Sequence, residues 1–194
     1  MNPLPDVLMN FRVHRVAFMM DIAAFFHQVL VDKKDADAFR FFWWANKECI
    51  RMILNKFLAH IFGSGASSCV TSYVLRYHAE VIKDMFGPEI YQIIHDLFYV
   101  DDGSGGADDV ETALKHKEDL ILAMKMGGFE LTKWKSNYPE LMDDTDQTEK
   151  IFSEAEEITK VLGMSWKPAV DLFTFKFNPK KGLHADTPRQ LVSI

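Results

Sequence analysis

Three aspartates in this sequence each follow a short apolar segment, and together they have the composition of a metal-dependent site. Asp21 ends the apolar run Val16–Met20. The pair Asp101–Asp102 follows the apolar segment Ile93–Val100 and precedes a glycine-rich stretch. Carboxylates that converge from neighbouring strands repel one another strongly unless cations are bound between them. Magnesium suits such a site, because it prefers hard oxygen ligands and is satisfied by a few carboxylates together with phosphate oxygens.

Two such ions about 4 Å apart can activate a hydroxyl nucleophile and stabilise the leaving group of an in-line displacement. Acidic pairs also have a plainer explanation, since Asp is common in turns as a solvated residue without a chemical role. For Asp101–Asp102 alone, the turn explanation is the favoured one. Asp21, at the end of a second apolar segment, makes a shared metal site the better explanation. We therefore expect the three carboxylates to converge.

The elements that must position these acids follow from hydrophobic periodicity and turn residues. Runs of strands with two long helices predict an α+β fold, in which an antiparallel sheet is covered by helices on one face. The predicted elements are, in order, a strand with a helical turn (Val16–Val31), a hairpin (Ala38–Trp44 with Cys49–Leu54), a helix (Cys69–Phe86), a second hairpin that carries the acids (Ile90–Leu97 with Phe98–Gly103), a helix (Ala107–Met126), a strand (Phe129–Trp134) and a last hairpin (Val161–Trp166 with Leu172–Phe177).

The composition is that of a folded domain. The 194 residues are 48% hydrophobic and include 16 Phe and 4 Trp, which is enough for one domain with a real core. No run of about 18 apolar residues is present, so no membrane span is predicted. The N-terminus has no pattern of a secretory signal. Two cysteines without metal-ligand spacing predict reduced thiols in an intracellular protein, cytoplasmic or particle-associated, and the seven scattered histidines do not predict zinc.

The formal net charge is −6. Neutralisation of phosphates by Lys and Arg supplies most of the affinity of proteins that hold nucleic acid. The acidic balance therefore counts against tight duplex binding by this chain alone. It is compatible with a catalytic piece whose basic clamps lie elsewhere.

Several segments, in order and at plausible spacings, resemble the reverse transcriptases of BEL/Pao-type retrotransposons over nearly the whole chain. The resemblance implies a reverse-transcriptase-like palm with partial fingers in residues 1–180, and the start of a truncated thumb or a linker in residues 181–194. It also implies an RNA-directed DNA polymerase that joins a dNTP to a primer 3′-hydroxyl with two Mg²⁺ (or Mn²⁺) ions. The segments are Val16–Val31, Phe41–Trp44 (FFWW), Phe62–Ser68 (FGSGASS), Phe98–Gly103 (FYVDDG), Gly127–Asn137 (GGFELTKWKSN), Val161–Trp166 (VLGMSW) and Asp171–Phe173.

The resemblance also assigns roles to residues. Asp21 and Asp101 are implied to bind metal, with Asp102 as their catalytic partner. Phe26 stands five residues after Asp21, where the family places an aromatic steric gate that would collide with a ribose 2′-hydroxyl. Further roles implied by the resemblance are triphosphate contacts from the backbone N–H groups of Ala24 and Phe25 and from Lys133, a nucleotide pocket at Phe62 and Gly63, and positioning of the primer by Tyr99, Met164, Ser165 and Trp166.

Most of these residues have a structural explanation as well. Phe25 and Phe26 can be core residues, and an isolated Lys133 is more often a surface charge. The loop Phe62–Ser68 can simply precede a helix, with Ser67 or Ser68 as its N-cap. Met164–Trp166 can be one more apolar strand of the core.

The sequence departs from the family at Ser68, where relatives carry Pro, and at Ala23 and Ala24, where polar or charged residues are frequent. By comparison with the family, we expect the sequence to lack the basic fingers strands, a complete thumb, and the RNase H and integrase regions. The implied partners are therefore the remainder of a polyprotein, an RNA or DNA template-primer and dNTP, with no membrane. Because positioning of the duplex supplies much of the rate in such reactions, we expect this chain alone to be weakly active or inactive.

Two other classes of protein stay open. The chain can be a catalytically silent, degenerate or domesticated retroelement fragment that acts as a nucleic-acid or protein interaction module. It can also be an unrelated α+β protein with a calcium-binding loop around Asp143–Asp146. That loop lacks the spaced ligands and the glycine of an EF-hand, which disfavours it.

Overall fold

The computed structural model describes residues 2–11, 13–45, 51–142, 159–161, 164–168 and 171–174. Its helices are α1 (Leu4–Asn10), α2 (Phe25–Gln28), α3 (Ser67–Phe86), α4 (Pro88–Asp96) and α5 (Val110–Met126), with 3-10 turns η1 (Ala36–Phe39) and η2 (Pro139–Leu141). Its strands are β1 (Val16–Ile22), β2 (Arg40–Trp44), β3 (Met52–Lys56), β4 (Phe98–Tyr99), β5 (Asp102–Ala107), β6 (Leu131–Ser136), β7 (Thr159–Val161), β8 (Met164–Lys167) and β9 (Leu172–Thr174).

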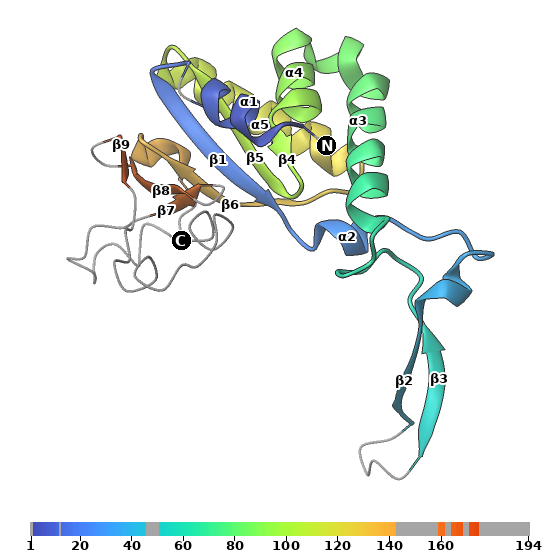
Figure 1. Ribbon diagram of the computed structural model, residues 1–194. Helices are drawn as coiled ribbons and strands as arrows, with labels where there is room; N and C mark the ends of the chain where they lie inside the picture. The colour runs from blue at the N-terminus through green and yellow to red at the C-terminus, as the bar shows by residue number, and fades with distance from the viewer. Residues whose placement is uncertain are drawn as a thin grey trace, which may run out of the picture.

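A four-stranded antiparallel sheet in the order β4-β5-β1-β6 forms the centre of the fold (Figure 1). Phe18 and Met20 of β1 belong to a core cluster that includes residues of α3, α4 and α5. On the other face, Met19 packs in a second cluster with Phe11 and the fully buried Trp166 of β8. Burial on both faces explains why β1 is a continuous apolar run rather than an alternating one.

The α+β class is correct, and so are most of the predicted elements. The two expected long helices, α3 and α5, contribute to the core on one face of the sheet together with α4. Phe11 and Trp166 cover part of the other face. Asp109 begins α5 as its N-cap and accepts a hydrogen bond from the Thr112 N–H at 2.8 Å. Gly127 ends this helix as predicted. Helix α1 and strand β7 are additional elements that the sequence analysis did not predict.

Two local predictions are wrong. Ile90–Leu97 is not a strand, because Pro88 begins α4 and the buried Ile90, Ile93 and Ile94 have the spacing of one helix face. The hairpin that carries the acids is therefore only β4 with β5. Neither Ser67 nor Ser68 caps α3, whose N-cap is Ala66. The Ser67 hydroxyl is instead within hydrogen-bond distance of His60 Nδ1, at 3.3 Å.

The β2–β3 hairpin extends away from the central sheet (Figure 1). Its register pairs Phe42 with Leu54 and Trp43 with Ile53. Phe42 and Trp43 are 66% and 64% exposed, so large apolar side chains lie at its surface. The hairpin was predicted, but β2 begins two residues later than expected, because Ala38 and Phe39 belong to η1, and β3 ends two residues later.

Some expectations fall on residues outside the described ranges. These are the thumb or linker in residues 181–194, the acidic loop at Asp143–Asp146 and the end of the last predicted strand. Among the helices that are described, none has both the length and the apolar character needed to cross a bilayer.

Glycines in β5 allow aromatic rings to lie directly against the strand. A Cβ atom on Gly105 would lie 2.6 Å from the Phe18 ring, which is too close for any real contact. We expect Gly105→Ala to lower the free energy of unfolding by about 1–3 kcal/mol, the usual cost of overpacking a core. Urea denaturation measures this change. Gly65→Ala is the matched control, because no atom lies within 4 Å of its added Cβ. Equal stability of the two variants would contradict this account of β5.

Candidate functional site

The pairing of β1 with β5 brings two of the three acids together. Asp21 lies directly opposite Asp102 in the antiparallel register. Residues opposite each other in such a pair project from the same face of the sheet, with Cβ atoms about 5 Å apart. Since Met20 and Ile22 belong to the helix-covered core, alternation along β1 directs Asp21 to the opposite face. The register therefore brings Asp21 and Asp102 together, and the convergence of all three carboxylates on shared cations stays a prediction.

Asp101 lies in the two-residue turn that Tyr99 and Asp102 close by pairing. Its neighbour Val100 has a φ of 59°, a positive value at the first central position, as a type II′ hairpin turn requires. Positive φ is rare for a β-branched residue. The Asp101 carbonyl oxygen accepts a hydrogen bond from the Ile22 N–H at 2.9 Å. This bond ties the turn to the end of β1, beside Asp21.

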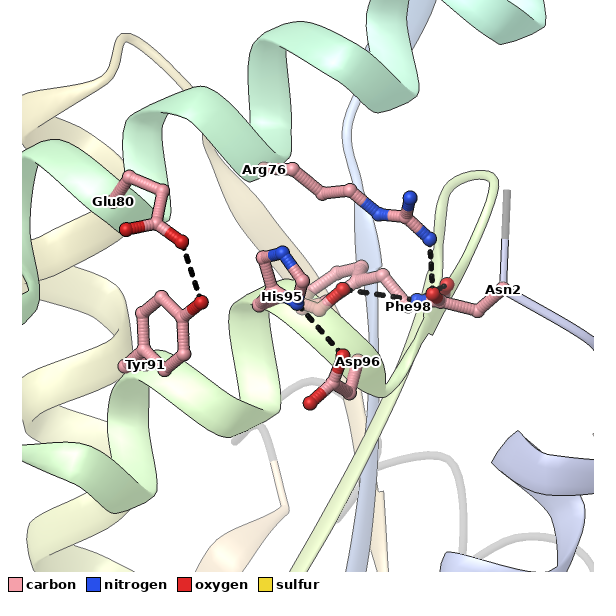
Figure 2. Close-up of polar contacts among 7 residues, drawn as sticks. All are labelled: Asn2, Arg76, Glu80, Tyr91, His95, Asp96 and Phe98. Carbon is pink, nitrogen blue, oxygen red and sulfur yellow. Dashed lines mark hydrogen bonds and ion pairs between the residues drawn. The ribbon is translucent and has the colours of Figure 1, made fainter.

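The first strand of this hairpin is held by the N-terminal segment (Figure 2). The Asn2 side-chain amide donates to the carbonyl oxygens of His95 and Phe98, at 3.1 and 3.0 Å. The Asn2 side-chain oxygen in turn accepts from the guanidinium of Arg76 on α3. These contacts connect α3 to the junction of α4 and β4, immediately before the turn that carries Asp101.

The electrostatics of the acids agree with their proximity. The pKa of Asp102 is raised to about 6, first by burial and then by the negative charges of Asp101 and Asp21. Burial is also the main cause of the raised pKa of Asp101, and the charge of Asp21 adds to it. The positive charge of Lys133 acts in the opposite direction on both groups. The acids therefore form one coupled set with an excess of negative charge.

A β-bulge in β6 aims Lys133 at this set. The register shifts between Met19 and Asp21, which leaves one extra residue on β6. Lys133 takes a φ of 56° there, and the next residue, Trp134, is buried with its ring 5.7 Å from that of Phe18. Lys133 Nζ donates to Asp21 Oδ2 at 3.1 Å. Bulges often re-aim a side chain beside an active site. The sequence analysis did not anticipate this ion pair, because no sequence signal marks a lysine that adopts positive φ.

Three of the predicted nucleotide-binding residues, Ala24, Phe25 and Phe26, follow β1 directly. Phe25 is a core residue that packs near Phe129, as its structural explanation requires. Phe26 is only 5% exposed and meets the Phe62 ring edge-on at 4.7 Å. Phe62 is itself 66% exposed. The candidate steric gate and the candidate pocket loop are thus in contact, with Phe62 as the outer ring.

Backbone geometry at both ends of this region is unusual. Ala24 has a φ of 50° and Gly63 a φ of 84°. Within the described part of the chain, the N–H groups of Ala24 and Phe25 donate no hydrogen bond. Successive backbone N–H groups at such a change of conformation can bind an anion. Their contact with a triphosphate stays a prediction.

The primer-positioning candidates have different surroundings. Tyr99 is partly exposed at the end of β4, opposite Asp102. Trp166 packs edge-on against Phe11 at 4.9 Å, and its Nε1 donates to Asp171 Oδ1 at 3.0 Å. Trp166 is therefore a core residue of this chain, whatever the strand around it contacts. Met164 and Ser165 belong to β8, and their contact with a primer stays a prediction.

Among the described residues, no three His, Cys, Asp or Glu side chains are arranged as a ready cation site. Magnesium, however, is usually held by one or two carboxylates, with waters and substrate phosphates completing its shell. Asp21 and Asp102 supply hard oxygen donors on one face of the sheet, and Asp101 is the residue next to Asp102 in the adjoining turn. The donor set therefore fits a divalent cation of this kind.

The fold is similar to that of the foamy viral protease–reverse transcriptase in complex with an RNA/DNA hybrid. The TM-score is 0.52 and the identity 14%, and the likeness covers 81% of this chain but 21% of that one. This chain thus corresponds to about a fifth of that protein's length, as the 21% coverage states. No protein-family model and no curated protein matches the sequence. At this identity the likeness shows a reverse-transcriptase-like fold.

The pKa of Asp102 predicts a stability change with a definite sign. Its value is about 6 in the folded protein against the ordinary 3.8, so the folded state binds this proton more tightly. Stability should therefore fall as pH rises through the interval between about 4 and 6. We expect Asp102→Asn to increase the free energy of unfolding by about 1–2 kcal/mol at pH 8 and to change it little at pH 4.

Urea denaturation of wild type and variant at both pH values measures this difference. Asp84→Asn removes an exposed carboxylate of α3 and serves as the control. An equal gain at both pH values would show that ionisation of the half-buried Asp102 is not the cause.

Proposed function

We propose that this chain is the palm of an RNA-directed DNA polymerase, related to the reverse transcriptases of BEL/Pao-type retrotransposons, with part of the fingers. The observation that carries the proposal is the pairing of Asp21 with Asp102 across β1 and β5, with Asp101 tied to the end of β1. The reverse-transcriptase-like fold supports it. The reaction is nucleotidyl transfer from a dNTP to a primer 3′-hydroxyl.

Asp21, Asp101 and Asp102 would hold the divalent ions in this proposal. Two Mg²⁺ or Mn²⁺ ions supply activation of the primer hydroxyl and stabilisation of the leaving pyrophosphate. The chain's own contribution is placement. The β1–β5 register fixes two carboxylates, and the hydrogen bond from Ile22 fixes the turn that bears the third. Fixed carboxylates need no rearrangement when charge develops, which is the main source of rate in phosphoryl transfer.

The nucleotide would lie beside α2, which begins three residues after β1 ends. The contact of Phe26 with Phe62 supports this, because it joins the steric gate to the pocket loop in one wall. The N–H groups of Ala24 and Phe25 lie at the start of the same helix, with no acceptor among the described residues. In this proposal, template-primer and dNTP bind on the face of the sheet that carries the acids. The other parts of a polyprotein are the partners of this chain.

A second candidate function is that of a catalytically silent interaction module. It is favoured by the β2–β3 hairpin, where Phe42, Trp43 and Leu54 are each more than half exposed, at 66%, 64% and 53%. Apolar surface of this kind commonly marks an interaction site. The two candidates differ in what the acids do, so substitutions at the acids separate them.

We expect extension of a DNA primer on an RNA template, with Mg²⁺ or Mn²⁺, to fall at least about a hundredfold in Asp101→Asn, as loss of one group that stabilises the transition state typically does. Asp84→Asn is the control for the loss of a carboxylate far from the site. Where the wild type gives no measurable extension, calorimetry with Mn²⁺ replaces it. Binding of Mn²⁺ should then disappear in the double variant Asp21→Asn, Asp101→Asn. Undiminished binding in that variant would reject the proposed site.

The proposed gate predicts a change in sugar selectivity. Phe26→Val removes the ring that would meet a ribose 2′-hydroxyl, so incorporation of ribonucleotides relative to deoxynucleotides should rise at least about tenfold. Incorporation of each nucleotide from matched pools measures this ratio. Phe25→Val removes the neighbouring ring, which faces the core, and should leave the ratio unchanged. A Phe26→Val enzyme with unchanged selectivity would mean that this ring is only a core residue.

A further inference from the structure

One carboxylate of the acidic set already has a cation beside it. Lys133 Nζ lies 3.1 Å from Asp21 Oδ2. The Lys133 side chain is 70% exposed, whereas that of Asp21 is 21% exposed. The bulge and the positive φ of Lys133 fix its backbone next to β1, so the pairing is set by the fold and not only by a flexible side chain.

We propose that Lys133 is the internal counter-ion of Asp21 in the metal-free protein, and that a divalent cation must displace its ammonium group to bind. This inference rests on the proposed function, because it takes Asp21 as a metal ligand. It adds a competition that neither the family resemblance nor the fold assigns to this lysine.

The competition follows from charge and space. An ammonium group at hydrogen-bond distance from Oδ2 and a divalent ion on the same carboxylate would repel each other at close range. In the described residues no three acids are arranged as a ready cation site, and Asp21 is engaged by Lys133. In the described ranges, neither Asp101 nor Asp102 forms an ion pair of this kind, and the charge of Lys133 lowers the pKa of both against the larger effect of burial.

Displacement of the Lys133 ammonium group from Asp21 should cost little free energy. The Lys133 side chain is largely in water, and exposed ion pairs contribute little net stability. After displacement, the fixed backbone keeps the ammonium group near the acids, within reach of an anionic ligand. Lys133 therefore lowers the affinity of the acids for a cation but does not block the site. Until a metal ion binds, its ammonium group supplies the positive charge beside Asp21.

The test is the affinity for Mn²⁺, measured by calorimetry at pH 7.5 on wild type, Lys133→Gln and Lys133→Arg. We expect Lys133→Gln to bind Mn²⁺ about 2- to 10-fold more tightly, and Lys133→Arg to resemble the wild type, because it keeps the charge. Lys115→Gln, at an exposed position of α5, changes the net charge equally and should leave the affinity unchanged. Lys133→Asn is a second variant whose side chain tolerates positive φ, and circular dichroism verifies the fold of each.

The outcomes separate this inference from the proposed function. Tighter binding in Lys133→Gln and Lys133→Asn, but not in Lys115→Gln, supports the competition. If wild type binds Mn²⁺ through the acids but Lys133→Gln binds it equally or more weakly, the counter-ion role is wrong and the metal site stands. If neither protein binds Mn²⁺, the metal site itself is wrong, and the competition is rejected with it.

Discussion

The pairing of Asp21 with Asp102 across β1 and β5 is the constraint around which the rest of this site is organised. An antiparallel register that pairs Asp21 with Asp102 puts like charges on one face of a sheet, where such pairs are destabilising. A register slip of one residue would separate them, but it would also turn Phe18 and Met20 out of the core. The buried face of β1 therefore holds the acids together against their own repulsion. A stable helical core on one side is what makes an unfavourable cluster on the other side possible.

Backbone strain gathers at the same place. Among the described residues other than glycine, positive φ occurs at Ala24, Val100, Lys133 and Asp171. Ala24 follows Asp21 closely, Val100 shares the turn with Asp101, and the Lys133 ammonium contacts Asp21. Such conformations cost of order 1–3 kcal/mol each and persist where the surrounding structure enforces them. Their concentration around the acids indicates a site shaped by more than packing, and it is a property of the backbone that composition does not encode.

Much of this arrangement could be predicted from the sequence, for identifiable reasons. Asp21 could be placed at a strand end because β1 is buried on both faces and reads as an unbroken apolar run. Ile90, Ile93 and Ile94 were harder, since a short apolar segment near a strand fits either period, and Pro88 was the feature that favoured a helix. The bulge at Lys133 and the burial of Trp166 depend on partners far along the chain, so no local pattern carries them. The family resemblance assigned chemical roles to single residues, which the hydrophobic periodicity of the sequence alone could not do.

The face that bears the acids is itself divided along β1. Ala17 and Met19 are covered by Phe11 and Trp166, so this part of the face is a second small core. Asp21 is the next residue of β1 on this face, two positions after Met19, and 21% of its side chain is exposed. The cover thus stops short of the acids, which stay reachable from water while the strand beneath them is clamped from both sides. Rigid support with an open end would suit the proposed site, which would have to admit ions and a substrate without moving its ligands. It also explains why a lysine can serve as counter-ion here, because only an accessible ion pair can exchange its partner.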